Sequence, residues 1–371
     1  MKKTYITLVG GQTIPAYQGI QLFPDSRPDE VIIVHSDDSH AEASRVAEAI
    51  SRFHGVKDVS LAACSPVDIQ DIKVCANSLR EEFQNDELVV NITGGTKMWT
   101  LGFFMAFWGL PHARVIYVDQ TNNAIDLVTA ETKRLSIPLE MRLWLSGVNV
   151  DNIEYMRFDD FTDEDISACA EIEQIRWLNT SAFRLLTNED EDVTTTDDGS
   201  SLKMNADGTE ASIDLYVPSE RKPKHFELRS PNLWRILLNY GWLELKTAAE
   251  ISKMSEVRDI WLGCVFRSDS GNMDINEIDI IADFGSRLVC VECKTWLYRP
   301  TDVNKFKSAV SNFSGSGSAC FFVANDLMDY SNECDARQIC QQNNIGYFNF
   351  SDSLISLKDV ILQSLQRQNK R

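Results

Sequence analysis

The stretches Asn276-Glu277-Ile278-Asp279 and Glu292-Cys293-Lys294, which a dozen residues separate, are the most informative about the fold of the C-terminal part of this chain. Apolar residues follow the first stretch and precede the second. Between them, the segment Asp283-Phe284-Gly285-Ser286 has the composition of a short turn. We therefore predict two adjacent β-strands that this turn joins into a hairpin.

The polar side chains of this hairpin are predicted to meet at one point. Side chains alternate between the two faces of a strand, so Glu277 and Asp279 share one face of the first strand. Glu292 and Lys294 share one face of the second strand for the same reason. When the strands pair, three carboxylates and one ammonium lie close together.

Such a group has the composition of a metal-dependent phosphodiesterase site. Carboxylate oxygens are the ligands that Mg²⁺ and Mn²⁺ prefer, and we predict Asp279 and Glu292 as metal ligands, with Glu277 assisting. Lys294 would position or deprotonate the attacking water and stabilise the developing negative charge. The alternative is a solvated face with a cross-strand ion pair, but the apolar neighbours favour a buried strand, where unused charges are costly.

This pattern resembles the PD-(D/E)XK nuclease superfamily, which has the restriction-endonuclease-like fold. The resemblance covers about the last 140 residues and implies an α/β nuclease domain over 231–371. Members often begin with a helix whose acidic residue points into the site, and Glu244 is the candidate here, unless it lies on a solvated helix face. The family's proline before the first acidic residue is absent, which leaves the set of metal ligands open.

Composition limits the remaining possibilities. The chain has 371 residues, enough for two domains or three small ones, and 43% of them are hydrophobic. It contains no run of 18 apolar residues and no secretory signal, so we expect a cytoplasmic protein with no membrane segment. The nine cysteines have no framework spacing and are expected to be free thiols. Cys290 and Cys293 would point to opposite faces of a strand, which argues against a zinc site.

The net charge of −19 is concentrated in the middle of the chain. Residues 151–230 carry 8 basic and 20 acidic side chains, whereas residues 231–371 carry 15 and 17. The predicted nuclease region is therefore nearly neutral, and weak affinity for bulk duplex DNA is expected.

The N-terminal part alternates strands with helices. We predict strands at 5–9, 31–35, 59–62, 88–92 and 114–118, with helices at 41–53, 67–83 and 98–108. Apolar strands alternating with helices indicate a doubly wound parallel sheet, whose ligands bind beyond the carboxyl ends of the strands.

Three predicted strand ends carry polar groups suited to a phosphate-bearing ligand: Gly10-Gly11-Gln12-Thr13, His35-Ser36-Asp37-Asp38 and Thr93-Gly94-Gly95-Thr96-Lys97. Glycines let a ligand approach the backbone, and a helix N-terminus offers unpaired N–H groups. Alternatively, the glycine loops are tight turns packed under the sheet. Neither the dinucleotide G-x-G-x-x-G nor the Walker G-K-[ST] pattern is present, which argues against NAD and a P-loop.

The segment Asn91-Ile92-Thr93-Gly94-Gly95-Thr96-Lys97 resembles the CARF domain, the CRISPR-associated Rossmann fold. The resemblance covers roughly residues 1–140 and implies a receptor for cyclic oligoadenylate, with cyclic tetra-adenylate expected before cyclic hexa-adenylate. It also implies a homodimer with the ring on its two-fold axis. The residues it places at the ring are Gly10, Gly11, Gln12, Thr13, Asp38, Thr93, Gly94, Gly95, Thr96 and Lys97.

Residues 141–230 are predicted to form an acidic connecting region. A helix is expected from Asp163 to Leu186, and the polar run that follows, through Ser201, has the composition of a solvated loop.

Together the two resemblances imply a type III CRISPR ancillary nuclease that cyclic oligoadenylate activates and that uses Mn²⁺ or Mg²⁺. Its expected substrate is single-stranded DNA or RNA, with Trp296 and Tyr298 either stacking bases or packing in the core. Two alternatives remain: a ligand-sensing regulator with an inactive C-terminal domain, and a ring nuclease that cleaves its own activator near Thr13 and Lys97.

Overall fold

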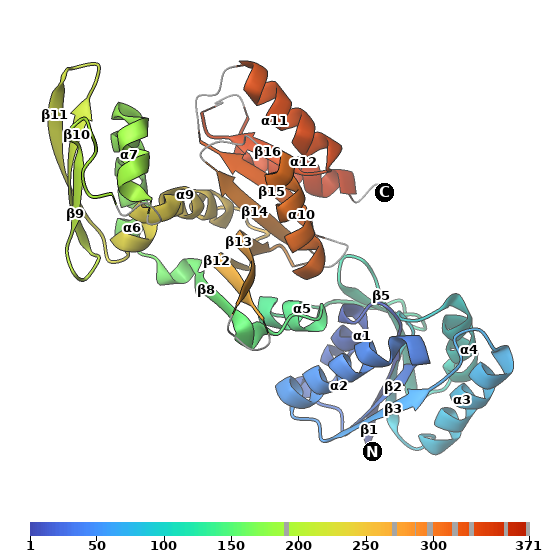
Figure 1. The fold of residues 1–371 in the computed structure, drawn as a ribbon. Helices are drawn as coiled ribbons and strands as arrows, with labels where there is room; N and C mark the ends of the chain where they lie inside the picture. Colours follow the sequence, from blue (N-terminus) through green and yellow to red (C-terminus); the bar gives the residue numbers. More distant parts are fainter. Residues whose placement is uncertain are drawn as a thin grey trace. The chain divides into compact units, whose positions relative to one another are not determined.

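The structure is a computed structural model that describes residues 1–188, 193–268, 273–285, 287–294, 300–313, 318–325, 330–351 and 355–368. The chain divides into two compact units, Met1–Asp151 and Asn152–Arg371 (Figure 1). In the described part of the chain, no helix combines the length and apolar composition needed to cross a membrane.

Unit 1 is built on a seven-stranded sheet with the order β3-β2-β1-β4-β5-β6-β7. The first five strands in that order are parallel: β1 (Lys3–Val9), β2 (Glu30–His35), β3 (Asp58–Ala63), β4 (Glu87–Asn91) and β5 (Ala113–Val118). Two short antiparallel strands, β6 (Asn123–Asp126) and β7 (Thr132–Arg134), complete the sheet. The predicted doubly wound parallel sheet is confirmed, and its strand order reverses between β1 and β4.

Helices cover both faces of this sheet (Figure 1). On one face lie α1 (Ile14–Gln18), α2 (His40–His54) and α5 (Leu139–Leu145), and on the other lie α3 (Ile69–Glu82) and α4 (Lys97–Phe107). In α2, Val46, Ala49 and Ile50 recur at helical spacing and are buried, as an amphipathic helix on a sheet requires. The central strands β1, β2 and β4 are buried on both faces, which explains their continuous apolar runs.

The main sheet of unit 2 has six strands among its described residues, in the order β16-β15-β14-β13-β12-β8. Antiparallel pairs join β8 (Ile153–Arg157), β12 (Asp259–Arg267), β13 (Asp274–Asp283) and β14 (Leu288–Lys294). Parallel pairs join β14 to β15 (Ala319–Ala324) and β15 to β16 (Gly346–Asn349). The predicted hairpin is therefore present as the antiparallel pair of β13 and β14. Ser286 of the predicted turn lies outside the described residues.

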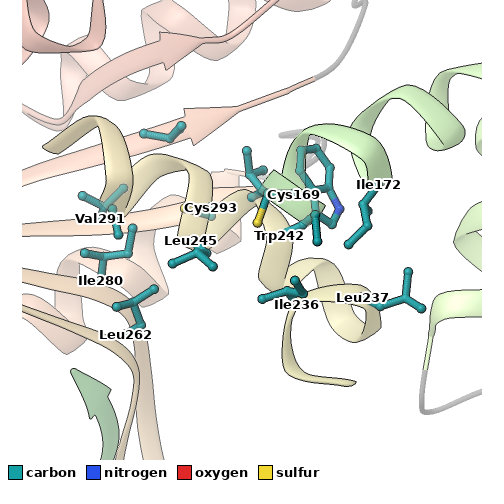
Figure 2. Close-up of a cluster of buried hydrophobic side chains, with 14 of the residues drawn as sticks. Cys169, Ile172, Ile236, Leu237, Trp242, Leu245, Leu262, Ile280, Val291 and Cys293 are labelled. Atoms are coloured by element: carbon teal, nitrogen blue, oxygen red, sulfur yellow. The ribbon is translucent and has the colours of Figure 1, made fainter. Parts of the chain in front are cut away.

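Helices pack on both faces of this sheet as well. On one face, α9 (Gly241–Ser252) and α12 (Leu357–Gln368) share a core with β13 and β14. Figure 2 shows Trp242 and Leu245 of α9 in this core, with side chains of α6, α8 and the sheet around them. On the opposite face, Phe306 of α10 (Pro300–Phe313) meets Phe322 of β15 edge to face at 5.2 Å, and α11 (Tyr330–Gln342) packs on β16.

The rest of unit 2 is a helical layer and a small antiparallel sheet. The sheet consists of β9 (Ser201–Met204), β10 (Glu210–Val217) and β11 (Lys222–Arg229). Alternate residues of β10, from Ala211 to Val217, are buried, and this face packs against α7 (Thr180–Thr187). The helix α6 (Asp163–Leu178) packs on α9. The short helix α8 (Leu233–Leu237) precedes α9 in the chain and contacts both.

Two features of the middle segment differ from the sequence prediction. The single helix expected over 163–186 is two helices, because Asn179 adopts an extended conformation and its side chain accepts the backbone N–H of Ala182 to cap α7. The segment predicted as the connecting region 141–230 is also divided differently. Its α5 packs in unit 1, whereas β8, α6, α7 and the small sheet belong to unit 2, since their apolar faces share its core.

Candidate functional site

The hairpin of β13 and β14 carries four of the five residues predicted at the catalytic site. Its ladder pairs Ile281 with Cys290 and ends with the pair Ile280 and Val291. Directly opposed residues share a face, so the face of Glu277 and Asp279 is also that of Glu292 and Lys294.

Beyond the end of the ladder, side chains take over the bonding. Asp279, which is only 7% exposed, accepts the backbone N–H of Cys293 with its Oδ2 at 2.6 Å. Lys294 Nζ lies 2.8 Å from Glu292 Oε1. The carboxylate of Asp279 is thus fixed against β14, close to the Glu292–Lys294 pair.

The fifth predicted residue, Glu244, reaches this site from α9. It lies in the first turn of the helix and its side chain is 13% exposed. A Cβ on Gly241 would lie 2.0 Å from the carbonyl oxygen of Arg235, so the glycine lets α9 begin directly against α8. This close packing sets the position of Glu244.

Arg235 is a member of the site that the sequence reading missed. Its Nη2 lies 3.7 Å from Glu244 Oε2, and its guanidinium occupies the space where a Cβ of Gly263 would stand. Gly263 has a φ of +56° within β12, where the pairing with β8 shifts register. A lone glycine inside an apolar strand is a signal of a bulge or a close approach, and it would have pointed here.

Burial and mutual repulsion act on the carboxylates. Burial raises the pKa of Glu244 well above its usual value, and the charge of Asp279 adds to this, while Arg235 opposes it. Glu277 is exposed, but partial desolvation and the charge of Asp279 also raise its pKa. Burial, followed by the charge of Glu292, raises the pKa of Asp279 to about 7. A cation placed among these groups would relieve the repulsion.

Lys294 is held in its charged form. Burial disfavours its ammonium, but the charges of Asp279 and Glu292 prevail and raise the pKa of Lys294 above its ordinary value. As placed, Lys294 is suited to stabilising negative charge, and it would need to lose a proton before it acted as a base.

The donor set fits a hard divalent cation. All four carboxylates offer oxygen, and with Lys294 and Arg235 charged the ionised site carries a net charge of −2, which one Mg²⁺ or Mn²⁺ would balance. Within the described ranges, no three acidic, histidine or cysteine side chains are arranged closely enough to hold a metal ion as they stand. Ligation by three of these side chains would therefore require at least one of them to move.

In unit 1, the predicted ligand residues lie at the carboxyl ends of the parallel strands. Gly10 to Thr13 follow β1, Asp38 follows β2, and Thr93 to Lys97 follow β4. Since β1 and β4 are neighbours where the strand order reverses, two of these loops meet at the place where such sheets bind ligands.

The glycines of these loops have packing roles that the sequence reading gave only as an alternative. A Cβ on Gly10 would stand 3.0 Å from the backbone of Gly95, and one on Gly94 would stand 2.0 Å from Leu8 O. Gly95 has a φ of +80° and lies against the ring of Trp99. The glycines therefore let the β4 loop pack tightly on the end of β1.

Three predicted hydroxyls are engaged within the protein. Thr13 donates to Leu145 O at 2.6 Å, and Thr93 accepts the N–H of Val118 at 2.7 Å. Thr96 caps α4, accepting from Trp99 N, and donates to Pro66 O at 2.7 Å. These residues shape the loops, whereas the exposed members are Gly11, Gln12, Asp38, Gly95 and Lys97. Trp296 and Tyr298, predicted as base-stacking or core residues, lie outside the described residues.

Residues 4–146 match the family model described as the Card1 CARF domain. The expectation of a Rossmann-like CARF fold for the N-terminal unit is thereby confirmed. The matched segment covers unit 1 almost completely and includes every ligand residue predicted there. Among curated proteins, no match to the chain was found.

Solved structures share the fold over most of the chain at low sequence identity. Can2 from Sulfobacillus thermosulfidooxidans, in complex with cyclic tetra-adenylate, has 18% identity and a TM-score of 0.66, over 98% of this chain and 99% of its own. Protein VC1899 from Vibrio cholerae has 13% identity and a TM-score of 0.68, over 99% and 98%.

A third structure covers less of its own length. It is described as a type III CRISPR defence DNA nuclease activated by cyclic oligoadenylate, and has 17% identity and a TM-score of 0.55. The alignment spans 88% of this chain but 46% of that one. Because all three identities are below 20%, the comparison shows a shared fold.

Proposed function

We propose that this protein is a metal-dependent nuclease of type III CRISPR defence that cyclic oligoadenylate activates. The single observation that carries the proposal is the group of Glu244, Glu277, Asp279 and Glu292 beside Lys294, on a hairpin and a helix of unit 2. This arrangement supports a PD-(D/E)XK site and a restriction-endonuclease-like fold for the C-terminal part of the unit.

In this proposal, Asp279 and Glu292 hold Mn²⁺ or Mg²⁺, and Glu244 and Glu277 complete or tune the site. The metal supplies a polarised phosphate and an acidified water when bound. Asp279 stays in place through its bond from Cys293, whereas the ammonium of Lys294 faces the charge that develops on the phosphate. The raised pKa values of Glu244, Glu277 and Asp279 reflect desolvation and repulsion among the carboxylates, and a bound cation would reduce the repulsion.

The activator is proposed to bind at the carboxyl edge of the sheet in unit 1. Cyclic tetra-adenylate is our first choice, and the Can2 complex supports it, since the likeness to that fold covers 98% of this chain. Gln12, Asp38 and Lys97 are exposed at this edge and are the side chains free to meet a ring of nucleotides. Lys97 lies at the start of α4, where the N-terminal N–H groups also favour a phosphate.

A homodimer is proposed because α4 presents an apolar stripe that unit 1 does not bury. Met98, Leu101, Met105 and Trp108 follow one another at intervals of three or four residues and are 38%, 56%, 74% and 46% exposed. We name these four residues the α4 stripe. The α4 stripe starts beside Lys97. If two copies of the chain paired through this stripe about a two-fold axis, their ligand-binding loops would lie next to each other and could enclose one cyclic ligand.

Single-stranded DNA or RNA is the proposed substrate. The protein carries a net charge of −19, which disfavours extended contacts with the phosphates of a duplex. A site that relies on one metal and a few cations suits short, accessible stretches of backbone.

The deciding experiment is cleavage of labelled single-stranded DNA and RNA in Mn²⁺, with cyclic tetra-adenylate, with cyclic hexa-adenylate and without a ring. Glu292→Ala should abolish cleavage. Glu173→Ala is its matched control, because Glu173 pairs with Lys246 at 2.7 Å as Glu292 pairs with Lys294, but outside the hairpin. The control should cleave normally.

The same experiment addresses the alternative functions. If no metal and no ring size produces cleavage, unit 1 would remain a sensor and the chain a regulator. Shortening of the ring itself, with no cleavage of the labelled strands, would instead indicate a ring nuclease.

A further inference from the structure

The side chain of Arg235 packs against β12 at Gly263, where the absence of a Cβ leaves room for its guanidinium. A Cβ built on Gly263 would stand 1.7 Å from Arg235 Nη2 and 2.9 Å from its Cζ. Any other residue at 263 would displace the guanidinium. The positive φ of Gly263 and the register shift beside it are the backbone features that make this room.

In this position the guanidinium of Arg235 lies beside the carboxylate of Glu244. Arg235 Nη2 lies 3.7 Å from Glu244 Oε2, and both side chains are largely covered, at 31% and 13% exposed. Because the guanidinium of Arg235 is confined by the backbone at Gly263, its side chain has few other orientations available. The ion pair therefore restricts where the carboxylate of Glu244 points.

We propose that Arg235, held in place by the bulge at Gly263, is a positioning residue that directs Glu244 toward Asp279. This inference deepens the proposed nuclease function and rests on it: Arg235 acts through Glu244 and does not itself ligate the metal. Partners that orient the ligands of a metal typically change its affinity about 10- to 100-fold when they are removed.

The test measures Mn²⁺ binding directly, by the electron paramagnetic resonance signal of free Mn²⁺, and needs no substrate. Arg235→Gln should weaken binding about tenfold, and Arg235→Lys should restore part of the loss. Gly263→Ala should reproduce the effect of Arg235→Gln, because the added Cβ would take the place of the guanidinium. Thermal unfolding of each variant would show that it is folded.

Arg258 provides a matched control. Its guanidinium lies over Gly285 in the same way, 2.7 Å from where a Cβ would stand, and Gly285 also has a positive φ. Arg258 precedes β12, and its backbone N–H donates to Asp283 O at 2.9 Å, at the C-terminal end of β13. Arg258→Gln should therefore leave Mn²⁺ affinity unchanged.

A double-mutant cycle separates positioning from a general structural effect. In a Glu244→Gln background, Arg235→Gln should cause no further loss of Mn²⁺ affinity. An equal loss in both backgrounds, or an equal loss in Arg258→Gln, would overturn the inference. Wild-type protein that binds no Mn²⁺ would overturn it too.

These outcomes are distinct from those of the proposed function. Mn²⁺ binding that depends on Arg235, without cleavage of any strand, would sustain the inference and contradict the nuclease. Cleavage with Mn²⁺ affinity independent of Arg235 would do the reverse.

Discussion

At the scale of single residues, the carboxylates of the site in unit 2 repel one another. Asp279 and Glu244 are largely buried and Glu277 lies exposed beside them, and desolvation together with the charges of neighbouring carboxylates raises the pKa of each. Such an arrangement costs stability unless the groups hold protons or a cation. The sequence pattern predicts this group, and its cost indicates a function.

The first prediction concerns Asp279→Asn in metal-free buffer. The pKa of Asp279 rises from 3.8 to about 7 on folding, so the folded wild type keeps a proton that the unfolded chain loses between these values. The stability from this proton is fully present below pH 3.8 and is lost as the pH rises through 7. Relative to the wild type, the free energy of unfolding of the variant should therefore rise by about 1–3 kcal/mol between pH 5 and pH 8.

Thermal or urea unfolding with a chelator would measure this difference. Added Mn²⁺ should reverse the order, because only the wild type keeps the ligand that binds the ion. A pH-independent difference between the two proteins would contradict the raised pKa.

The second prediction concerns Lys294→Met. Removing the ammonium should lower cleavage by roughly 10²- to 10⁴-fold with little loss of activator affinity, because the charge acts on the reacting phosphate. Lys246→Met is the control: Lys246 forms an ion pair with Glu173 and a cation–π contact with Phe350, and none of these residues belongs to the hairpin. Equal losses in the two variants would exclude a specific role for Lys294.

At the scale of secondary-structure elements, α4 joins a ligand loop to an exposed apolar surface. Trp99, Phe103 and Phe107 bury one side of the helix, while the α4 stripe leaves the other side uncovered. A helix that is apolar nearly all round is expected to be buried on both sides. The composition of α4 thus supports an interface along its outer side.

The third prediction is that Leu101→Glu with Met105→Glu yields a monomer by light scattering and abolishes ring-dependent cleavage. Two buried charges facing their copies across a two-fold interface are costly, so dissociation is expected. Val128→Glu, which replaces another exposed apolar residue of unit 1, is the control and should remain dimeric. A wild type that is already monomeric with the ring bound would contradict the proposed dimer.

At the scale of the whole molecule, the chain combines a CARF-type unit with a second α/β unit, and Can2 and VC1899 share the fold over nearly all of it. The acidic segment 151–230 is integrated into unit 2, because α6, α7 and β10 share its core. Under the proposed function, binding at unit 1 and cleavage at unit 2 are properties of separate sites. Their coupling is therefore measurable as a shift in one upon change in the other.

The fourth prediction uses this separation. Lys97→Ala should raise the ring concentration needed for half-maximal cleavage about tenfold, because it removes one charged contact to a phosphate. Cleavage at saturating ring should stay near the wild-type level. Lys73→Ala, on the exposed side of α3, is the control, and a fall in maximal cleavage for Lys97→Ala alone would place Lys97 outside the ligand site.

Local sequence patterns were enough to predict the α/β class, the doubly wound sheet of unit 1 and the hairpin with Glu277, Asp279, Glu292 and Lys294. These features follow from local patterns: apolar runs, alternation along a strand and turn composition. Glu244 was predicted through the family resemblance, from its place near the start of a helix. Each of these signals lies within a few residues of chain.

Features that depend on contacts between distant segments could not be predicted from the sequence and are seen in the folded chain. The bulge at Gly263, the passage of Arg235 to Glu244 and the integration of β8 into the main sheet join segments far apart in the chain. The same holds for Gly94, whose place against Leu8 explains a glycine that the sequence assigned to ligand approach. Local patterns carry the periodicity of an element, whereas close approach between elements is a property of packing, which no single segment contains.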